Sequence, residues 1–333
     1  METLLPTFLQ NITVGPEQRH RNLVIFALLA DQGAPVDYLT LDEALEQRVL
    51  TITEIDAAGE VPSLKVVNSS SQKVLLLDGE ELVGAKQNRI LNVTILLAPR
   101  STTTLPVSCI ERGRWSFESH EFRSPKRTIS ADLRKKKTQS VNFFLRNFGA
   151  FHSDQGEIWD EIEAKFARAQ IQPSPTQALS DLYEVQKDSS EDYLRRFSPV
   201  AGQVGLAAVI DGALAGAELL GRSDTLQRLY PKLVGSYVLD ALETADQQTV
   251  APTSPQVVQD LLLDAAAAIV ERRPSVALGF DLRLESARVI GAGLEFGDHI
   301  LHLSLFRQEP PPADRTRPRP LRQASRRRRD IIR

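Results

Sequence analysis

The sequence has few of the residues from which cross-links and metal sites are built. Its 333 residues include one cysteine, Cys109, and five histidines. One cysteine excludes an intrachain disulfide and a cysteine zinc cluster. The histidines show neither an HxxxH nor an HExxH spacing, and His299 and His302 lie three apart in an expected strand, where they face opposite sides. We therefore predict no metal site and no bound cofactor.

Long apolar runs are also absent. No segment reaches the ~18 apolar residues of a membrane-spanning helix. The first residues, METLLPTFLQNITVG, contain no basic leader followed by an apolar core. Because nothing in the sequence indicates a membrane, we expect a protein of the reducing cytoplasm.

Positive charge is scarce in most of the chain and concentrated at its end. The formal net charge is −3. Residues 307–333 hold ten arginines against three acidic residues, a net charge of +7, which leaves −10 on residues 1–306. An acidic body excludes a general attraction to nucleic acid. The Arg/Pro-rich segment 307–333 is predicted to be disordered, and it either keeps the protein soluble or makes weak, salt-sensitive contacts with nucleic acid.

The remaining composition, with 42% hydrophobic and 25% charged residues, is that of a soluble globular protein. Short apolar runs and apolar alternation predict mostly strands in residues 1–125, and apolar residues three and four apart predict helices in 126–199. Residues 200–306 mix both patterns and end in antiparallel strands. We therefore predict an α+β fold in which residues 1–306 form a single domain.

Two local patterns give clear starting points for secondary structure. Thr40 and Glu43 have the spacing of a capping box, which predicts a helix beginning directly after Thr40. Asp211 and Gly212 separate two β-like runs, which predicts a tight hairpin.

Two further patterns predict helices in the last third of the chain. Pro231 lies within an apolar-periodic segment and is expected to start a new helix there, because proline fits a first helical turn. The Ala-rich segment 254–273 is expected to be helical throughout.

A polar segment separates two of the most apolar runs of the chain. DGEELVGAKQNRILN, residues 78–92, lies between KVLLL and VTILL. Segments 89–97 and 103–110 are expected to pair as a hairpin that turns near Ser101, although a link this long allows the register to slip. Polar groups at the end of an apolar hairpin are typical of the rim of a pocket.

This hairpin predicts which polar residues meet. Arg89 is expected to lie opposite a residue within 111–113. The KQNR of residues 86–89 would then lie beside the CIERGRW of residues 109–115.

Nine residues in and near these segments are candidates for a ligand site. They are Glu80, Lys86, Gln87, Asn88, Arg89, Asn92, Glu111, Arg114 and Trp115. Lysine and arginine suit phosphate or carboxylate groups, amides suit sugar hydroxyls or a base, and tryptophan offers a flat face for a ring. If a reaction is catalysed, Glu80 or Glu111 is the candidate base, and the other seven residues are the candidate ligand contacts.

Each of these features also has a purely structural interpretation. Charged strand ends commonly form cross-strand ion pairs, so the polar cluster is either a ligand site or an ion-pair network. Cys109, within an apolar strand, is expected to be a buried apolar side chain. The basic run 123–137 is either a solvated loop and helix start or a phosphate-binding lip of the same site. Asp281 and Arg283 are expected to form an exposed or interfacial pair.

The sequence resembles one known family. LLLDGEELVGAKQNRILN, LPVSCIERGRW, YPKLVGSYVLDAL and VIGAGLEFGDHILHLSLF together are similar to the ARG and rhodanese-phosphatase-superfamily-associated protein domain family, from about Leu9 to Phe306. The family's name records an association with ADP-ribosylglycohydrolases and NAD-linked phosphatase-like proteins. The resemblance implies a role in handling NAD or ADP-ribose derivatives and transfers no catalytic mechanism to this chain.

Two functions are compatible with these patterns. The first is a cytoplasmic protein that binds, with or without processing, a nucleotide-sugar phosphate such as an ADP-ribose or NAD derivative. The second is a non-catalytic module whose charged rim recognises a protein partner. The sequence does not decide whether any bond is broken.

Overall fold

Strands from both ends of the chain form one antiparallel sheet. The computed structural model describes residues 4–31, 33–56, 59–245 and 253–308. The sheet has eight strands in the spatial order β1 (Thr13–His20), β2 (Leu23–Leu29), β12 (Gln203–Ile210), β13 (Ala213–Leu220), β17 (His299–Arg307), β16 (Val289–Phe296), β15 (Phe280–Glu285) and β14 (Ile269–Pro274). Because β2 pairs with both β1 and β12, the N-terminal and C-terminal segments share this sheet.

Two smaller sheets are built entirely from the segment between β2 and the first long helix. One has the order β11 (Phe122–Arg123), β7 (Glu81–Gly84), β8 (Arg89–Leu91), β10 (Ser101–Cys109), β5 (Ser63–Asn68) and β4 (Leu50–Glu54). The other has the order β3 (Tyr38–Thr40), β6 (Lys73–Leu76) and β9 (Ile95–Leu97), in which β3 and β6 run parallel.

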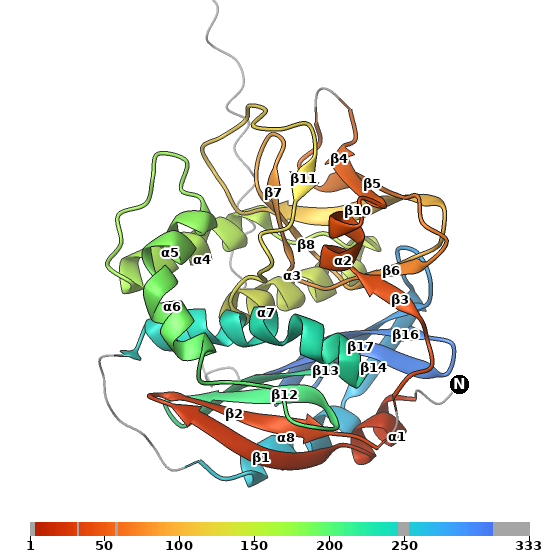
Figure 1. Cartoon of the computed structure of the whole chain (residues 1–333), viewed down its shortest axis with the longest axis vertical. Helices are drawn as coiled ribbons and strands as arrows, with labels where there is room; N and C mark the ends of the chain where they lie inside the picture. Colours follow the sequence, from red (N-terminus) through yellow and green to blue (C-terminus); the bar gives the residue numbers. More distant parts are fainter. Residues whose placement is uncertain (1–3, 32, 57–58, 246–252, 309–333) are drawn as a thin grey trace, which may run out of the picture.

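Some helices cover the two faces of the large sheet, and others pack against the smaller sheets. The helices are α1 (Leu5–Gln10), α2 (Leu41–Glu46), α3 (Ala131–Phe148), α4 (Gln155–Arg168), α5 (Leu179–Val185), α6 (Lys187–Leu194), α7 (Ser223–Leu242) and α8 (Gln256–Ala266). α2 and α4 are among those that pack against the smaller sheets. α7 and α3 lie between the large sheet and the two smaller sheets, whereas α1 and α8 cover the opposite face of the large sheet (Figure 1). Among the described residues, no helix combines the length and apolarity that crossing a bilayer requires.

Each face of the large sheet has its own apolar core. α7 packs against one face through side chains such as Leu226, Leu233 and Val234. α1 and α8 pack against the other face through side chains such as Leu5 and Leu261. Burial on both faces explains why β2 reads LVIFALL without polar alternation. The α+β class predicted from the sequence is confirmed.

Two of the local predictions are confirmed in detail. The hydroxyl of Thr40 accepts a hydrogen bond from the backbone amide of Glu43, and the Glu43 carboxylate accepts one from the backbone amide of Thr40. This capping box starts α2, as predicted. Asp211 and Gly212 have φ angles of 50° and 79° and join β12 to β13, as a tight hairpin turn requires.

Two predictions in the last third were wrong. Pro231 lies inside α7, which continues from Ser223 to Leu242, because burial of one long face against the sheet outweighs one lost backbone hydrogen bond. The segment 254–273 is not one helix: α8 ends at Ala266, and β14 begins at Ile269 and pairs with β15. Strand pairing overrides the helical propensity of this part.

The register of the predicted hairpin was also wrong. Arg89 pairs with Cys109 rather than with a residue in 111–113. Only β8 pairs with β10, since the first half of β10 pairs with β5 and the chain leaves this sheet after Leu91 to form β9 in another sheet. The predicted tail 307–333 lies, from residue 309 onward, outside the described residues.

A layer of buried charges lies where α3 and α7 face the large sheet. Arg134 of α3 forms an ion pair with Glu218 of β13, at 2.5 Å between Nη1 and Oε1. His302 of β17 bridges Glu218 to Thr94, with distances of 3.1 Å from Nε2 to Oε2 and 2.8 Å from Nδ1 to the Thr94 hydroxyl. Burial alone would raise the pKa of Glu218, but Arg134 and His302 outweigh it and hold the pKa below its usual value.

The same layer contains two more buried pairs. Lys137 of α3 forms an ion pair with Asp78 and donates to the Asn92 carbonyl at 2.8 Å. Asp281 and Arg283 form a pair that is almost completely buried, so of the two expected placements, exposed or interfacial, the exposed one was wrong. Since both side chains point toward the same face of β15, the covering elements exclude water from both.

Breaking the Lys137–Asp78 pair should destabilise the protein strongly. Lys137→Met leaves Asp78 buried without its cation, so the free energy of unfolding should fall by about 3–5 kcal/mol. Lys135→Met, at a half-buried position of the same helix, should change it by less than about 0.5 kcal/mol. Urea unfolding measures both values. Equal effects of the two substitutions would contradict a structural role for the pair.

Candidate functional site

The two polar segments predicted to meet do lie side by side. β8 and β10 carry them, and the amide of Ile110 donates to the Asn88 carbonyl at 3.1 Å. The amide of Asn88 donates to Oε2 of Glu111 at 3.1 Å, and Nε2 of Gln87 donates to the Glu111 carbonyl at 2.9 Å. Residues 86–89 and 109–115 therefore form one polar cluster at this end of the six-stranded sheet.

Arg114 and Glu111 form a fully hydrogen-bonded ion pair within this cluster. Nε and Nη2 of Arg114 donate to the two carboxylate oxygens of Glu111 at 2.9 and 2.7 Å. Nη1 of Arg114 donates to the Ala85 carbonyl at 2.7 Å, and Nη2 also reaches Oδ1 of Asn88 at 3.2 Å. Because these groups satisfy one another, the pair holds the two segments together and offers little to a ligand.

Arg89 is a residue of this cluster with incomplete hydrogen bonding among the described residues. Its side chain is completely buried. Nη1 donates to Oε1 of Gln87 at 3.0 Å, whereas Nη2 lies 3.9 Å from Oε1 of Glu54, an ion-pair distance too long for a hydrogen bond. Nε and Nη2 have no hydrogen-bond partner in the part of the chain that the structure describes. Leaving buried charged donors unsatisfied is costly, so this guanidinium differs from an ordinary structural arginine.

Glu54 is a site residue that the sequence patterns did not single out. Its Oε1 accepts the amide of Lys86 at 3.2 Å, and its buried Oε2 has no hydrogen-bond partner among the residues described. The signal was present in β4, LTITE, where Leu50, Ile52 and Glu54 alternate toward the interior. A carboxylate at an inward position of an alternating strand indicates a buried acid that requires a partner.

Two aromatic rings cover the cations of the cluster. Cζ of Arg89 lies 5.6 Å from the ring centre of Trp115, and Nζ of Lys86 lies 5.4 Å from the same ring. Nζ of Lys86 also lies 5.1 Å from the ring centre of Phe117. Trp115 and Phe117 are 41% and 49% exposed, so the rings separate buried cations from solvent.

Cys109 lies beneath this cluster as a buried side chain. Its Sγ donates to Oε1 of Gln87 at 3.2 Å, the same oxygen that accepts from Arg89. Burial raises the pKa of the Cys109 thiol to about 11, against a smaller opposite effect of Arg89. The structure thus supports a small buried side chain rather than a nucleophile.

Two of the nine candidate residues lie apart from the others. Glu80 pairs with Lys232 of α7, at 2.5 Å between Oε1 and Nζ, and burial raises its pKa. Asn92 accepts from the Ser108 hydroxyl at 2.7 Å and donates to the Phe151 carbonyl at 3.0 Å. Both side chains point into interfaces between elements and away from Arg89.

The basic run 123–137 is divided between solvent and interior: Arg123, Lys126 and Lys136 are exposed, whereas Arg134 and Lys137 are buried. Most of its cations have acidic partners in the structure. The pairs are Lys126–Glu46, Arg127–Glu81, Arg134–Glu218, Lys136–Glu161 and Lys137–Asp78. The solvated interpretation therefore holds for part of the run only, because helix α3 turns Arg134 and Lys137 into the interior. Pairing with neighbouring acids leaves few of its cations available to a phosphate.

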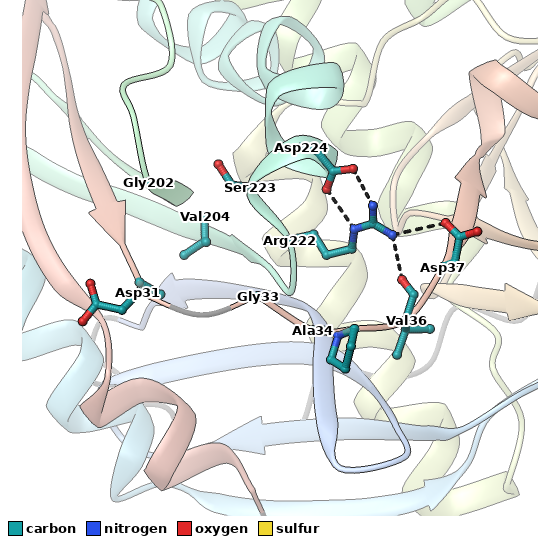
Figure 2. A pocket seen from close by; sticks show the side chains of 12 residues that line it. Asp31, Gly33, Ala34, Val36, Asp37, Gly202, Val204, Arg222, Ser223 and Asp224 are labelled. Carbon is teal, nitrogen blue, oxygen red and sulfur yellow. Dashed lines mark hydrogen bonds and ion pairs between the residues drawn. The ribbon is translucent and has the colours of Figure 1, made fainter.

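Another pocket lies away from this cluster, next to the start of α7. It has a volume of about 670 Å³. Its polar lining includes Asp31, Asp37, Arg222, Ser223 and Asp224. Figure 2 shows that the Arg222 guanidinium is bound on two sides, by Asp224 at 2.8 and 2.5 Å and by the Val36 carbonyl at 2.8 Å. With three aspartates against one fully engaged arginine, this pocket is unsuited to an anionic ligand.

The fold and the cluster define an α+β protein with a buried, incompletely paired arginine and glutamate beneath partly exposed aromatic rings. The chain belongs to the ARG and Rhodanese-Phosphatase-superfamily-associated Protein domain family, whose model matches residues 11–306. No curated protein and no solved structure gave a match. Within the described ranges, no group of three or more His, Cys, Asp or Glu side chains is arranged to hold a metal ion.

The buried thiol gives a direct test of this packing. At pH 8 a thiol with a pKa near 11 has about a hundredfold less thiolate than one with an ordinary pKa of 9.0. Native protein should therefore react with a disulfide reagent such as DTNB at least a hundredfold more slowly than protein unfolded in guanidinium. Rapid reaction of one thiol per native chain would show that Cys109 is accessible and reactive.

Proposed function

We propose that this protein binds a nucleotide-sugar phosphate, such as an ADP-ribose or NAD derivative, and that Arg89 anchors an anionic group of that ligand. The observation that carries the proposal is the unfilled Nε–Nη2 edge of a completely buried guanidinium. This edge presents two parallel N–H donors, the geometry that matches the oxygens of phosphate or carboxylate.

In three other arginines of the same chain, a carboxylate occupies the Nε–Nη2 edge. In Arg114, Arg222 and Arg283, Nε and Nη2 donate to both oxygens of one carboxylate, at distances between 2.5 and 2.9 Å. Arg89 has Glu54 nearby, but at 3.9 Å and without a hydrogen bond. An anion supplied by a ligand would complete at Arg89 the contact that the other three make internally.

The surroundings of Arg89 favour a ligand that carries a ring as well as an anion. The partly exposed rings of Trp115 and Phe117 lie over the cations and can stack on a base. Trp115 would have to swing outward to admit the ligand. The family description names ARG and rhodanese-phosphatase proteins, and this name is the reason for choosing ADP-ribose or NAD derivatives as the chemical class to test.

The proposal concerns binding rather than a defined reaction. Both carboxylates predicted as bases are engaged, Glu111 by Arg114 and Glu80 by Lys232. Glu54, with one oxygen free of hydrogen bonds beside Arg89, is the carboxylate best placed to act on a bound ligand or to compete with it.

Thermal stability with a nucleotide panel tests the proposal. ADP-ribose or NAD should raise the melting temperature. At a ligand concentration a hundredfold above Kd, binding adds about 2.7 kcal/mol to the free energy of unfolding. Arg89→Lys keeps the charge but loses the two-donor edge, so it should fold and bind at least tenfold more weakly. Arg100→Gln, an exposed change in the turn directly before β10, should bind as the unmodified protein does.

A different result would favour the protein-interaction module. If no nucleotide in the panel changes the melting temperature, and the protein immobilised on a resin retains a specific protein partner, the ligand proposal fails. Equal ligand affinity of the Arg89→Lys and unmodified proteins would show that Arg89 does not anchor the ligand.

Removing the competing carboxylate should have the opposite effect. In Glu54→Gln the negative charge 3.9 Å from Nη2 of Arg89 is lost, so an anionic ligand should bind about tenfold more tightly. Glu60→Gln, at an exposed position, serves as the matched control. Titration calorimetry measures both affinities; weaker binding by Glu54→Gln would mean that Glu54 contacts the ligand directly instead of competing with it.

A further inference from the structure

A second pocket lies on the other side of the segment that carries Glu111 and Arg114. It has a volume of about 230 Å³, below the ~300–1,000 Å³ typical of drug-sized ligands. One wall is a face of α4, with Trp159, Ile162, Glu163 and Phe166 spaced three and four residues apart. The opposite wall is the segment 171–177, and Arg112 closes one side.

Two backbone hydrogen bonds hold this second wall in place. The amides of Arg112 and Gly113 both donate to the Thr176 carbonyl, at 3.0 and 2.9 Å. A Cβ at position 113 would lie 2.7 Å from the Pro175 carbonyl oxygen, so the approach requires glycine. The pocket is thus a fixed feature of the fold, bounded by a helix and by a clamped loop.

The floor of the pocket is apolar and its rim is polar. Ile162, Phe166, Ile171 and Pro173 supply the apolar part. The rim carries one cation, one anion and two amides, from Arg112, Glu163, Gln172 and Gln177. An apolar cavity with a few polar groups at its edge is the usual form of a small-molecule site.

The two rim charges are exposed to solvent and make no ion pair with each other. Within the described part of the chain, neither the Arg112 guanidinium nor the Glu163 carboxylate has a hydrogen bond or an ion pair, and Arg112 instead lies over the Trp159 ring at 5.5 Å. Some charges of α4 are paired, since Arg168 binds both Glu161 and Glu243, whereas the exposed Asp160 has no ion pair among the described residues. The buried Nε1 of Trp159 also has no partner among the described residues.

We propose that this pocket binds an apolar amino acid in its zwitterionic form. The carboxylate of the amino acid would pair with Arg112, its ammonium group with Glu163, and its side chain would occupy the floor formed by Ile162 and Phe166. A ligand with a single charge would pair with only one of the two exposed rim charges. The proposal does not depend on the function assigned to Arg89.

Single-charge analogues test this assignment. L-Leucine or L-phenylalanine, titrated up to ~10 mM by calorimetry, should bind the full-length protein. 3-Phenylpropionate, which lacks the ammonium group, and phenethylamine, which lacks the carboxylate, should each bind at least tenfold more weakly than phenylalanine. An analogue that binds as tightly as the amino acid, or an absence of binding by both amino acids, would overturn the proposal.

Substitutions at the rim locate the binding. Arg112→Gln and Glu163→Gln are both exposed changes that should leave the fold intact, and each should weaken amino-acid binding at least tenfold. Asp160→Asn, an exposed carboxylate of α4 that does not line the pocket, is the matched control and should bind normally. Binding that survives both rim substitutions would place the amino acid somewhere else and contradict the proposal.

Discussion

Charge buried without water must be paired inside the protein, and this constraint organises the interior of the molecule. α3 inserts Arg134 and Lys137 between the large and small sheets, where Glu218 and Asp78 neutralise them. Each such pair joins two elements that are distant in sequence, so the pairs fix how the sheets and helices sit against one another. Breaking one leaves an uncompensated buried charge, which costs far more than the pair itself contributes.

Against this background the environment of Arg89 is an exception. Its guanidinium is as buried as that of Arg134, but among the described residues two of its nitrogens, Nε and Nη2, have no hydrogen-bond partner, whereas Arg134 and Arg283 each have one such nitrogen. Local strain or unsatisfied groups of this kind concentrate at functional sites, where a ligand completes the arrangement. In the proposed site, the rings above Arg89 would act as a lid and the nearby Glu54 would compete with an anionic ligand.

The sequence predicted the class of the fold and the convergence of residues 86–89 with 109–115, because short-range patterns and hairpin geometry determine both. It could not give the register, since β10 divides its pairing between β5 and β8, which no local pattern reveals. Glu54 was missed because it reaches Arg89 from a strand more than thirty positions away. Pro231 and β14 were misassigned where packing and strand pairing outweigh local propensity.

The most direct test of the central claim is a crystal structure of the protein with ADP-ribose or a related phosphate. The account predicts an anionic oxygen within hydrogen-bond distance of both Nε and Nη2 of Arg89, with Trp115 displaced from its position over the guanidinium. A structure in which ordered water or Glu54 fills that edge, with the ligand absent or bound elsewhere, would contradict it.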